Sequence, residues 1–130
     1  MKRDIKAIIH CSDSSQGRGT TAKDIHRWHQ EEPRKWDGIG YHYVILENGT
    51  VENGRPEYWI GSHAKGYNSS IGICLIGEDT FRHAQMIALE KLIKDKGWSN
   101  DEVVGHYQVN KNKTCPNFDV DKFLIAIEVN

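Results

Sequence analysis

The sequence of 130 residues has room for one domain, because domains typically hold about 100 to 200 residues. Seventeen Lys and Arg against 18 Asp and Glu give a net charge of -1, which argues against a nucleic-acid partner bound through its phosphates. The apolar stretches are far shorter than the about 20 residues that a membrane span needs. The first residues are basic, but no apolar segment follows them, so we expect no signal peptide and a chain made as a cytosolic protein.

The first half of the chain predicts a strand, a helix and a hairpin. Residues 5–11 are rich in isoleucine and lead into a serine-rich loop, which is typical of a buried strand. A capping-box pattern precedes an amphipathic segment, which predicts a helix over 21–32. Residues 41–46 are aromatic and β-branched, and Asn48-Gly49 predicts a tight turn into a return strand over 50–52.

The second half begins with a long segment, 53–70, that has no sustained period and predicts an ordered loop of the kind that often carries function. A buried central strand, a helix closed by a glycine, a short strand and a final helix then follow, at 71–76, 81–96, 103–104 and 119–127. The order β, α, β, β, loop, β, α, β, α favours helices on both faces of one mixed sheet. We therefore expect a single α/β domain over 1–130.

The three cysteines do not form a disulfide framework, because they are too few and too widely scattered. Cys11 and Cys74 lie in apolar strands and are expected to be buried thiols. Since alternate strand residues share a face, Cys11 is expected to point away from any site that uses His10. Cys115 lies in a polar loop beside Lys113, whose charge favours the thiolate form that binds metal.

Two histidines are candidates for metal ligands because each comes at the end of a strand. His10 ends the first predicted strand, and His106 follows the short strand near 103–104. With Cys115 they would supply three protein ligands to zinc and leave one position open, as in catalytic zinc sites. No compact metal-binding motif supports this grouping, so spacing alone also allows each histidine to be an ordinary hydrogen-bonded residue.

Six separated motifs make the sequence similar to one family. They are Ile-Ile-His10-Cys-Ser, Gly40-Tyr41-His-Tyr with the later Asn-Gly-Thr-Val-Glu-Asn-Gly-Arg, Gly61-Ser-His63-Ala-Lys-Gly-Tyr-Asn68, Ser70-Ile-Gly-Ile-Cys-Leu-Ile-Gly77, Gly105-His106 and Lys113-Thr-Cys115-Pro-Asn-Phe. Together they resemble the zinc-dependent N-acetylmuramoyl-L-alanine amidases, nearest to the small bacteriophage lysozymes that are amidases. The similarity to peptidoglycan recognition proteins is more distant. The resemblance runs from about residue 5 to residue 123.

The resemblance implies a role for five residues. His10, His106 and Cys115 match the family's ligands to one zinc ion, Tyr41 matches its catalytic tyrosine, and Lys113 matches a lysine of the phage members. Bound zinc would lower the pKa of a water molecule to about 7. The Tyr41 hydroxyl and the Lys113 ammonium are donors suited to holding an oxyanion or moving a proton, and the two jobs are not divided between them.

The remaining polar residues of interest receive weaker assignments. His63 and Asn68 match the loop that lines the family's substrate cleft, so we expect contact with substrate or support of the site; a loop held by its own hydrogen bonds is the alternative. The other four histidines are given no chemistry. An ordinary helix face explains His26 and His29, His42 alternates away from Tyr41 in its strand, and His83 begins a helix.

The activity that the resemblance implies is hydrolysis of the amide between N-acetylmuramic acid and L-alanine in bacterial peptidoglycan. The expected setting is a phage or prophage endolysin that stays in the host cytoplasm until a pore-forming protein opens the membrane. Peptidoglycan is the expected partner, without nucleic acid or membrane, and the chain is expected to be a monomer. Two alternatives are a non-catalytic peptidoglycan-binding module and a structural zinc site with a fourth protein ligand.

Overall fold

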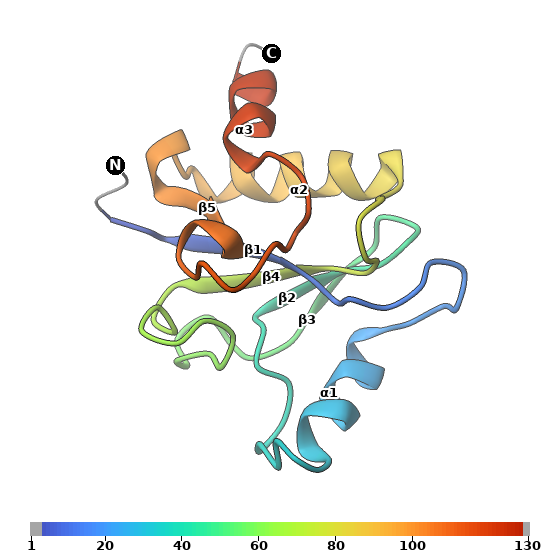
Figure 1. Ribbon diagram of the computed structural model, residues 1–130. Helices are drawn as coiled ribbons and strands as arrows, with labels where there is room; N and C mark the ends of the chain where they lie inside the picture. The colour runs from blue at the N-terminus through green and yellow to red at the C-terminus, as the bar shows by residue number, and fades with distance from the viewer. Residues whose placement is uncertain (1–3, 129–130) are drawn as a thin grey trace.

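The computed structural model describes residues 4–128 (Figure 1). The first three residues, whose basic character entered the sequence analysis, and the last two lie outside this range. The elements in chain order are β1 (Ala7–Cys11), α1 (Ala22–Gln30), β2 (Tyr43–Ile45), β3 (Val51–Asn53), β4 (Ile71–Leu75), α2 (His83–Lys96), η1 (Asn100–Glu102), β5 (Val103–Gly105), η2 (His106–Gln108) and α3 (Val120–Glu128). The expected mixed sheet and three α-helices are confirmed, and no helix within 4–128 is long and apolar enough to cross a membrane.

The sheet has five strands in the order β3-β2-β4-β1-β5. β1 lies in parallel between β4 and β5, β4 is also parallel to β2, and β3 is the antiparallel edge strand formed by the hairpin. Gly49 takes a φ of +90° in that turn, a backbone conformation that favours glycine and explains the Asn-Gly signal. Since four strands run in parallel, their carboxyl ends meet along one edge of the sheet.

Helices α2 and α3 cover one face of the sheet, and α1 lies on the opposite side (Figure 1). On the first face Ile9, Ile73 and Leu75 of the strands pack with Leu89 of α2 and Leu124 of α3, and all five side chains are buried. This face holds the larger part of the core. Burying a side chain of this size typically stabilises the fold by about 1.5–3 kcal/mol, so this two-helix layer anchors the sheet.

The opposite face is covered less completely because α1 is short. Ile25 of α1 packs with Val44, Cys74 and Ile76 over the β2 and β4 side of the sheet. A separate small cluster of Ile8, Ala64 and Val104 lies over β1 and β5, where the loop from 61 to 70 crosses instead of a helix. His10, which is buried, shares this face with Ile8 because the two are alternate residues of β1.

Several element boundaries differ from the sequence expectations; helix α1 ends at Gln30 rather than at 32, and β3 spans Val51–Asn53 rather than 50–52. β2 begins at Tyr43 rather than at 41, although the backbone of 41 and 42 still hydrogen-bonds to Gly54 and Arg55 across the hairpin. Helix α2 begins at His83, because Gln85 caps the backbone N–H of Arg82. The two 3₁₀ turns, η1 and η2, were not predicted from the sequence, since three residues are too few to show a periodic pattern.

Candidate metal centre and cleft

Neighbouring strands bring His10 and His106 together. β1 and β5 are parallel, and their register pairs Ile9 with Gly105, so the next residue of each chain segment is a histidine at the same level of the sheet. His106 begins η2, and the chain then turns through a polar loop that returns Cys115 to the same place. The two histidines at strand ends and the cysteine of the following loop do come together, because their ligand atoms lie within 4.8 Å of one another; that they bind a metal stays a prediction.

Two of the three distances within this group are close to those of a tetrahedral metal site. His10 Nδ1 lies 3.1 Å from His106 Nδ1, and Cys115 Sγ lies 3.6 Å from the same His106 nitrogen. With metal–ligand bonds of about 2.0–2.1 Å to nitrogen and about 2.3 Å to sulfur, tetrahedral zinc separates two nitrogens by roughly 3.3 Å and nitrogen from sulfur by roughly 3.6 Å. The two imidazoles and the thiol therefore form a donor set of zinc type and spacing.

A hydrogen-bonded relay fixes the tautomer of His10. The Ser70 carbonyl oxygen lies 2.8 Å from His63 Nε2, and because a carbonyl only accepts, His63 carries its proton on Nε2. His63 Nδ1 is then an acceptor, and His10 Nε2, at 2.9 Å, donates to it. His10 consequently carries its proton on Nε2 and presents the bare lone pair of Nδ1 to the cluster, which is the form that binds metal.

Burial keeps these imidazoles neutral. It lowers the pKa of His10 well below its usual value, with further contributions from the charges of His63 and His106. Burial also lowers the pKa of His63 to about 4, and burial and then Lys113 lower the pKa of His106. Near neutral pH the histidines therefore do not need to lose a proton before they bind a cation.

Cys115 lies against a second thiol, that of Cys11. The hydrogen bond from the Cys11 thiol lowers the pKa of Cys115, and Lys113 lowers it further. The same pairing, together with burial, raises the pKa of Cys11. The expectation that Cys11 would point away from the site of His10 is wrong, because Cys11 is the last residue of β1 and the returning loop crosses it; Asn117 Nδ2 also lies 3.7 Å from Cys11 Sγ.

Tyr41 and Lys113 both border the cluster. The Tyr41 ring centroid lies 5.1 Å from that of His10, on the side where α1 packs. Burial, followed by the nearby thiols of Cys74 and Cys115, raises the pKa of Tyr41 well above its usual value, so its hydroxyl stays protonated and able to donate. Lys113 is exposed on the loop that carries Cys115 and lines the same cavity.

The cluster opens into a cavity of about 790 Å³. His10, Tyr41, His106, Lys113 and Cys115 all line it. A second cavity of about 460 Å³ adjoins it on the α1 side. The residues shared by the two linings are Ser12, Asp13, His29, Arg34 and Tyr41. The two cavities thus form one cleft, wide enough for an extended ligand rather than a small ion alone.

The loop before β4 supplies His63 and Asn68, and both line the larger cavity. The Asn68 side-chain oxygen accepts hydrogen bonds of 2.8 Å from the backbone N–H groups of His63 and Ala64. Asn68 therefore holds the loop in shape, and His63 supports His10 through the relay. Support of the site therefore holds for His63, whereas the side-chain bonds of Asn68 lie within its own loop, as the alternative expectation had it. Contact of either residue with substrate stays a prediction.

Three histidines outside the cluster position the polypeptide around it. His29 Nδ1 accepts the N–H of Gly40 at 2.9 Å, and His26 Nδ1 accepts the N–H of Ile39 at 3.0 Å, so α1 fixes the backbone just before Tyr41. His42, buried, accepts the N–H of Gly72. Sequence reasoning missed these bonds, because a side chain that accepts from a distant backbone leaves no spacing signal; His29 also lines both cavities.

Comparisons with known proteins agree on one family. The family profile described as N-acetylmuramoyl-L-alanine amidase matches residues 3–118. The endolysin of Escherichia phage T7 is 37% identical over 127 residues, which cover 89% of this chain and 82% of that protein. An endolysin N-acetylmuramoyl-L-alanine amidase, LysCS of Clostridium intestinale, has a TM-score of 0.78 at 28% identity over 98% of this chain and 86% of its own. Drosophila PGRP-LB has a TM-score of 0.76 at 29% identity, covering 98% and 81%.

Proposed function

Since this chain belongs to the N-acetylmuramoyl-L-alanine amidase family, we propose that His10, His106 and Cys115 hold one zinc ion in its active site. The chain is a peptidoglycan amidase, and the bond it hydrolyses joins N-acetylmuramic acid to the L-alanine of the stem peptide. The observation that carries the assignment of the ligands is the tight grouping of two imidazole nitrogens and a thiol at spacings that suit zinc.

The lining of the cavity agrees with hydrolysis of an amide rather than of a glycosidic bond. Glycoside hydrolysis needs two carboxyl groups flanking the bond. Within residues 4–128, the larger cavity, into which the cluster opens, has one carboxylate in its lining, that of Asp13, and the smaller cavity adds that of Glu78. Glu78 lines the smaller cavity only, which the cluster residues do not line. The lining of the larger cavity also includes a protonated tyrosine and a lysine, which are donors that suit an oxygen gaining negative charge.

Zinc in this site would polarise the substrate carbonyl and lower the pKa of a water molecule, which supplies the nucleophile near neutral pH. His10 holds the neutral tautomer that ligates through Nδ1, because His63 and the Ser70 carbonyl fix the proton on the other nitrogen. Tyr41 and Lys113 donate to the carbonyl oxygen as it becomes negative, or pass a proton to the departing amine of L-alanine.

The two alternatives are less well supported. A structural zinc site usually has four protein ligands, whereas no fourth His, Cys, Asp or Glu joins this cluster within residues 4–128. A binding module that has lost catalysis has no need of the complete set of ligands and donors found here. The binding module is one outcome of the digestion experiment that follows.

The proposed setting is that of the phage endolysins that this chain resembles. The chain would gather in the cytoplasm of the bacterial host and reach the wall once the membrane is opened. It would act as a monomer on peptidoglycan, because one chain supplies all three candidate ligands and both donors.

Digestion of purified peptidoglycan, with and without a zinc chelator, tests this function. New amino groups and new reducing sugars are measured separately. We expect chelator-sensitive release of L-alanine amino termini without new reducing ends. Wall binding without cleavage by the zinc-loaded protein would support the recognition module instead, and new reducing ends would contradict the bond assignment.

A further inference from the structure

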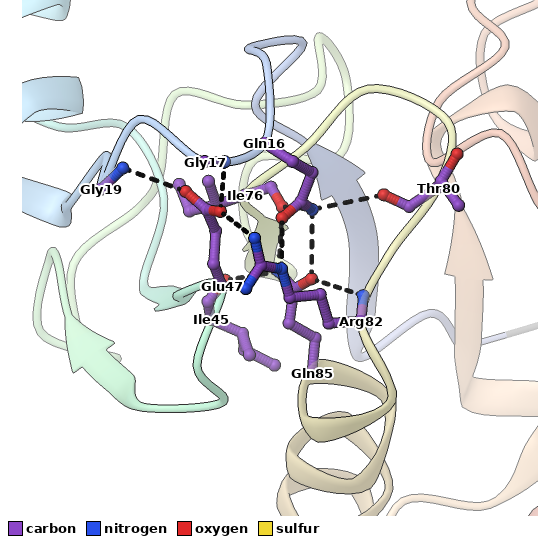
Figure 2. Close-up of polar contacts among 9 residues, drawn as sticks. All are labelled: Gln16, Gly17, Gly19, Ile45, Glu47, Ile76, Thr80, Arg82 and Gln85. Carbon is purple, nitrogen blue, oxygen red and sulfur yellow. Dashed lines mark hydrogen bonds and ion pairs between the residues drawn. The ribbon is translucent and has the colours of Figure 1, made fainter.

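A polar network holds the loop that follows β1 against the ends of β2 and β4 and the start of α2 (Figure 2). Its centre is Glu47, which follows β2 and is 9% exposed. The carboxylate accepts the backbone N–H of Gly17 at 2.5 Å and that of Gly19 at 3.1 Å. Both glycines have positive φ, +85° and +66°, so the loop is folded into a shape that few other residues adopt.

The carboxylate is held from its other side by the start of α2. Arg82 Nη2 lies 3.2 Å from Glu47 Oε1, and Arg82 Nε donates to Gln16 Oε1 at 3.1 Å. Gln85, fully buried, accepts the N–H of Arg82 and donates to the Ile76 carbonyl oxygen after β4. Glu47 therefore joins the ends of β2 and β4, the N-terminus of α2 and the loop into one hydrogen-bonded unit (Figure 2).

The other side of the same loop forms a wall of the cleft. Ser12, Asp13, Ser14, Ser15 and Arg18 all line the smaller cavity, next to Tyr41, and Ser12 and Asp13 also line the larger one. The chain between Ser12 and Gly19 has no helix or strand of its own. Its shape depends on several anchors. Ser12 and Asp13 bond to the end of β4, the Gln16 side chain bonds to the Ile76 carbonyl oxygen and to Arg82, and Gly17 and Gly19 bond to Glu47.

We propose that Glu47 is a positioning residue for substrate binding: it holds the Ser12–Gly19 loop in the conformation that forms the α1 side of the cleft. This rests on the proposed function, because it takes the cleft as the place where the muramoyl peptide lies. Glu47 does not line either cavity, so its effect passes through the backbone of Gly17 and Gly19. Losing it should weaken substrate binding and leave the chemistry at the cluster intact.

The test compares Glu47→Ala and Glu47→Gln with the parent on a soluble muramoyl peptide. In Glu47→Ala two backbone donors and Arg82 lose their acceptor, so KM should rise by about three- to tenfold while kcat stays within about twofold. Glu47→Gln keeps one acceptor oxygen but loses the charge, so its KM should lie between that of the parent and that of Glu47→Ala. Zinc affinity should be unchanged in both variants.

Glu52→Ala is the matched control. Glu52 also accepts a backbone N–H, that of Ala22 at the start of α1, but it makes no contact with Gly17 or Gly19. It should leave KM unchanged. Hydrogen exchange at the Gly17 and Gly19 amides gives a second measurement that needs no activity, and it should become faster in Glu47→Ala than in Glu52→Ala.

Three results would overturn the inference. The first is an unchanged KM for Glu47→Ala in an active protein, and the second is unchanged exchange at the two glycine amides. A fall in kcat and zinc affinity with no change in KM would also contradict it, because that pattern belongs to a general loss of structure. Failure of the parent to cleave peptidoglycan would refute the proposed function instead, and the exchange measurement would still decide the role of Glu47 in the loop.

Discussion

At the scale of single residues, the cluster shows how neighbours decide what a side chain can do. His10 is a ligand candidate because its other ring nitrogen is already committed to His63, and His63 is committed in turn to the Ser70 carbonyl. Cys115 is the thiolate candidate because Cys11 donates to it and Lys113 lies near. Each assignment follows from a second residue that does not itself touch the metal position.

The His63 relay predicts a change in metal affinity. Replacing His63 by Ala frees the ring of His10 to rotate and to exchange its proton between the two nitrogens, so zinc should bind about 10- to 100-fold more weakly. Competition with a chelator of known affinity measures this directly. His83→Ala, an exposed histidine at the start of α2, is the control and should bind zinc as the parent does. Equal affinities of the parent and His63→Ala would contradict the relay.

Tyr41 predicts a change in rate without a change in metal binding. Phenylalanine keeps the ring that packs beside His10 and His29 but removes the hydroxyl donor. Loss of one oxyanion donor typically lowers kcat by about 10²- to 10³-fold. Steady-state kinetics of Tyr41→Phe on a soluble muramoyl peptide, with zinc content measured in the same sample, checks this. A kcat within about twofold of the parent would remove Tyr41 from the reaction.

At the scale of elements, the sequence predicted those helices, strands and turns that are determined by residues close together in the chain. The periodic apolar residues of α2, the Asn-Gly turn and the apolar runs of β1 and β4 each follow from neighbours in the sequence, and all are present. His10 and His106 could be grouped because parallel strands end at one edge. The bonds from His29 to Gly40 and from Glu47 to Gly17 could not, because they join segments that only the finished fold brings together.

The packing of α2 predicts a strong difference between two residues of one helix. Leu89 is fully buried against the sheet, whereas Ile87 is 53% exposed. Leu89→Ala should lower the free energy of unfolding by about 2–5 kcal/mol through the lost contacts and the cavity left behind. Ile87→Ala should change it by no more than about 0.5 kcal/mol. Urea unfolding of the two variants checks this, and equal losses would mean that α2 does not pack as described.

At the scale of the whole molecule, one face of the sheet provides most of the stability and the other provides the site. The face under α2 and α3 carries most of the core, while the face under α1 is left partly uncovered and holds the cleft. Buried histidines gather on this second face and are kept neutral by it. The site therefore makes the stability of the whole chain depend on pH.

The expected dependence has a definite sign. Burial and the charge of Arg34 lower the pKa of His29 to about 4 in the folded chain, against 6.5 as the ordinary value. The unfolded chain takes up the proton first, so the stability is complete above about pH 6.5 and is lost as the pH falls toward 4. The loss is on the order of 3 kcal/mol from this residue.

Urea unfolding at several pH values between 7 and 4 measures this loss, with a chelator present so that metal binding does not contribute. His29→Gln cannot take up a proton, so its stability should fall less steeply than that of the parent over this range. Since His63 has a similarly lowered pKa, part of the dependence should remain in the variant. Identical slopes for the parent and His29→Gln would contradict this origin of the acid sensitivity.

The central claim is that His10, His106 and Cys115 hold one zinc ion that peptidoglycan hydrolysis requires. The most direct measurement is the addition of zinc in small steps to the metal-free protein, with amide cleavage followed at each step. We predict that activity rises in proportion and stops rising at one zinc per chain, and that Cys115→Ala neither binds zinc tightly nor regains activity. Full cleavage by the metal-free protein, or parental zinc affinity in Cys115→Ala, would contradict the account.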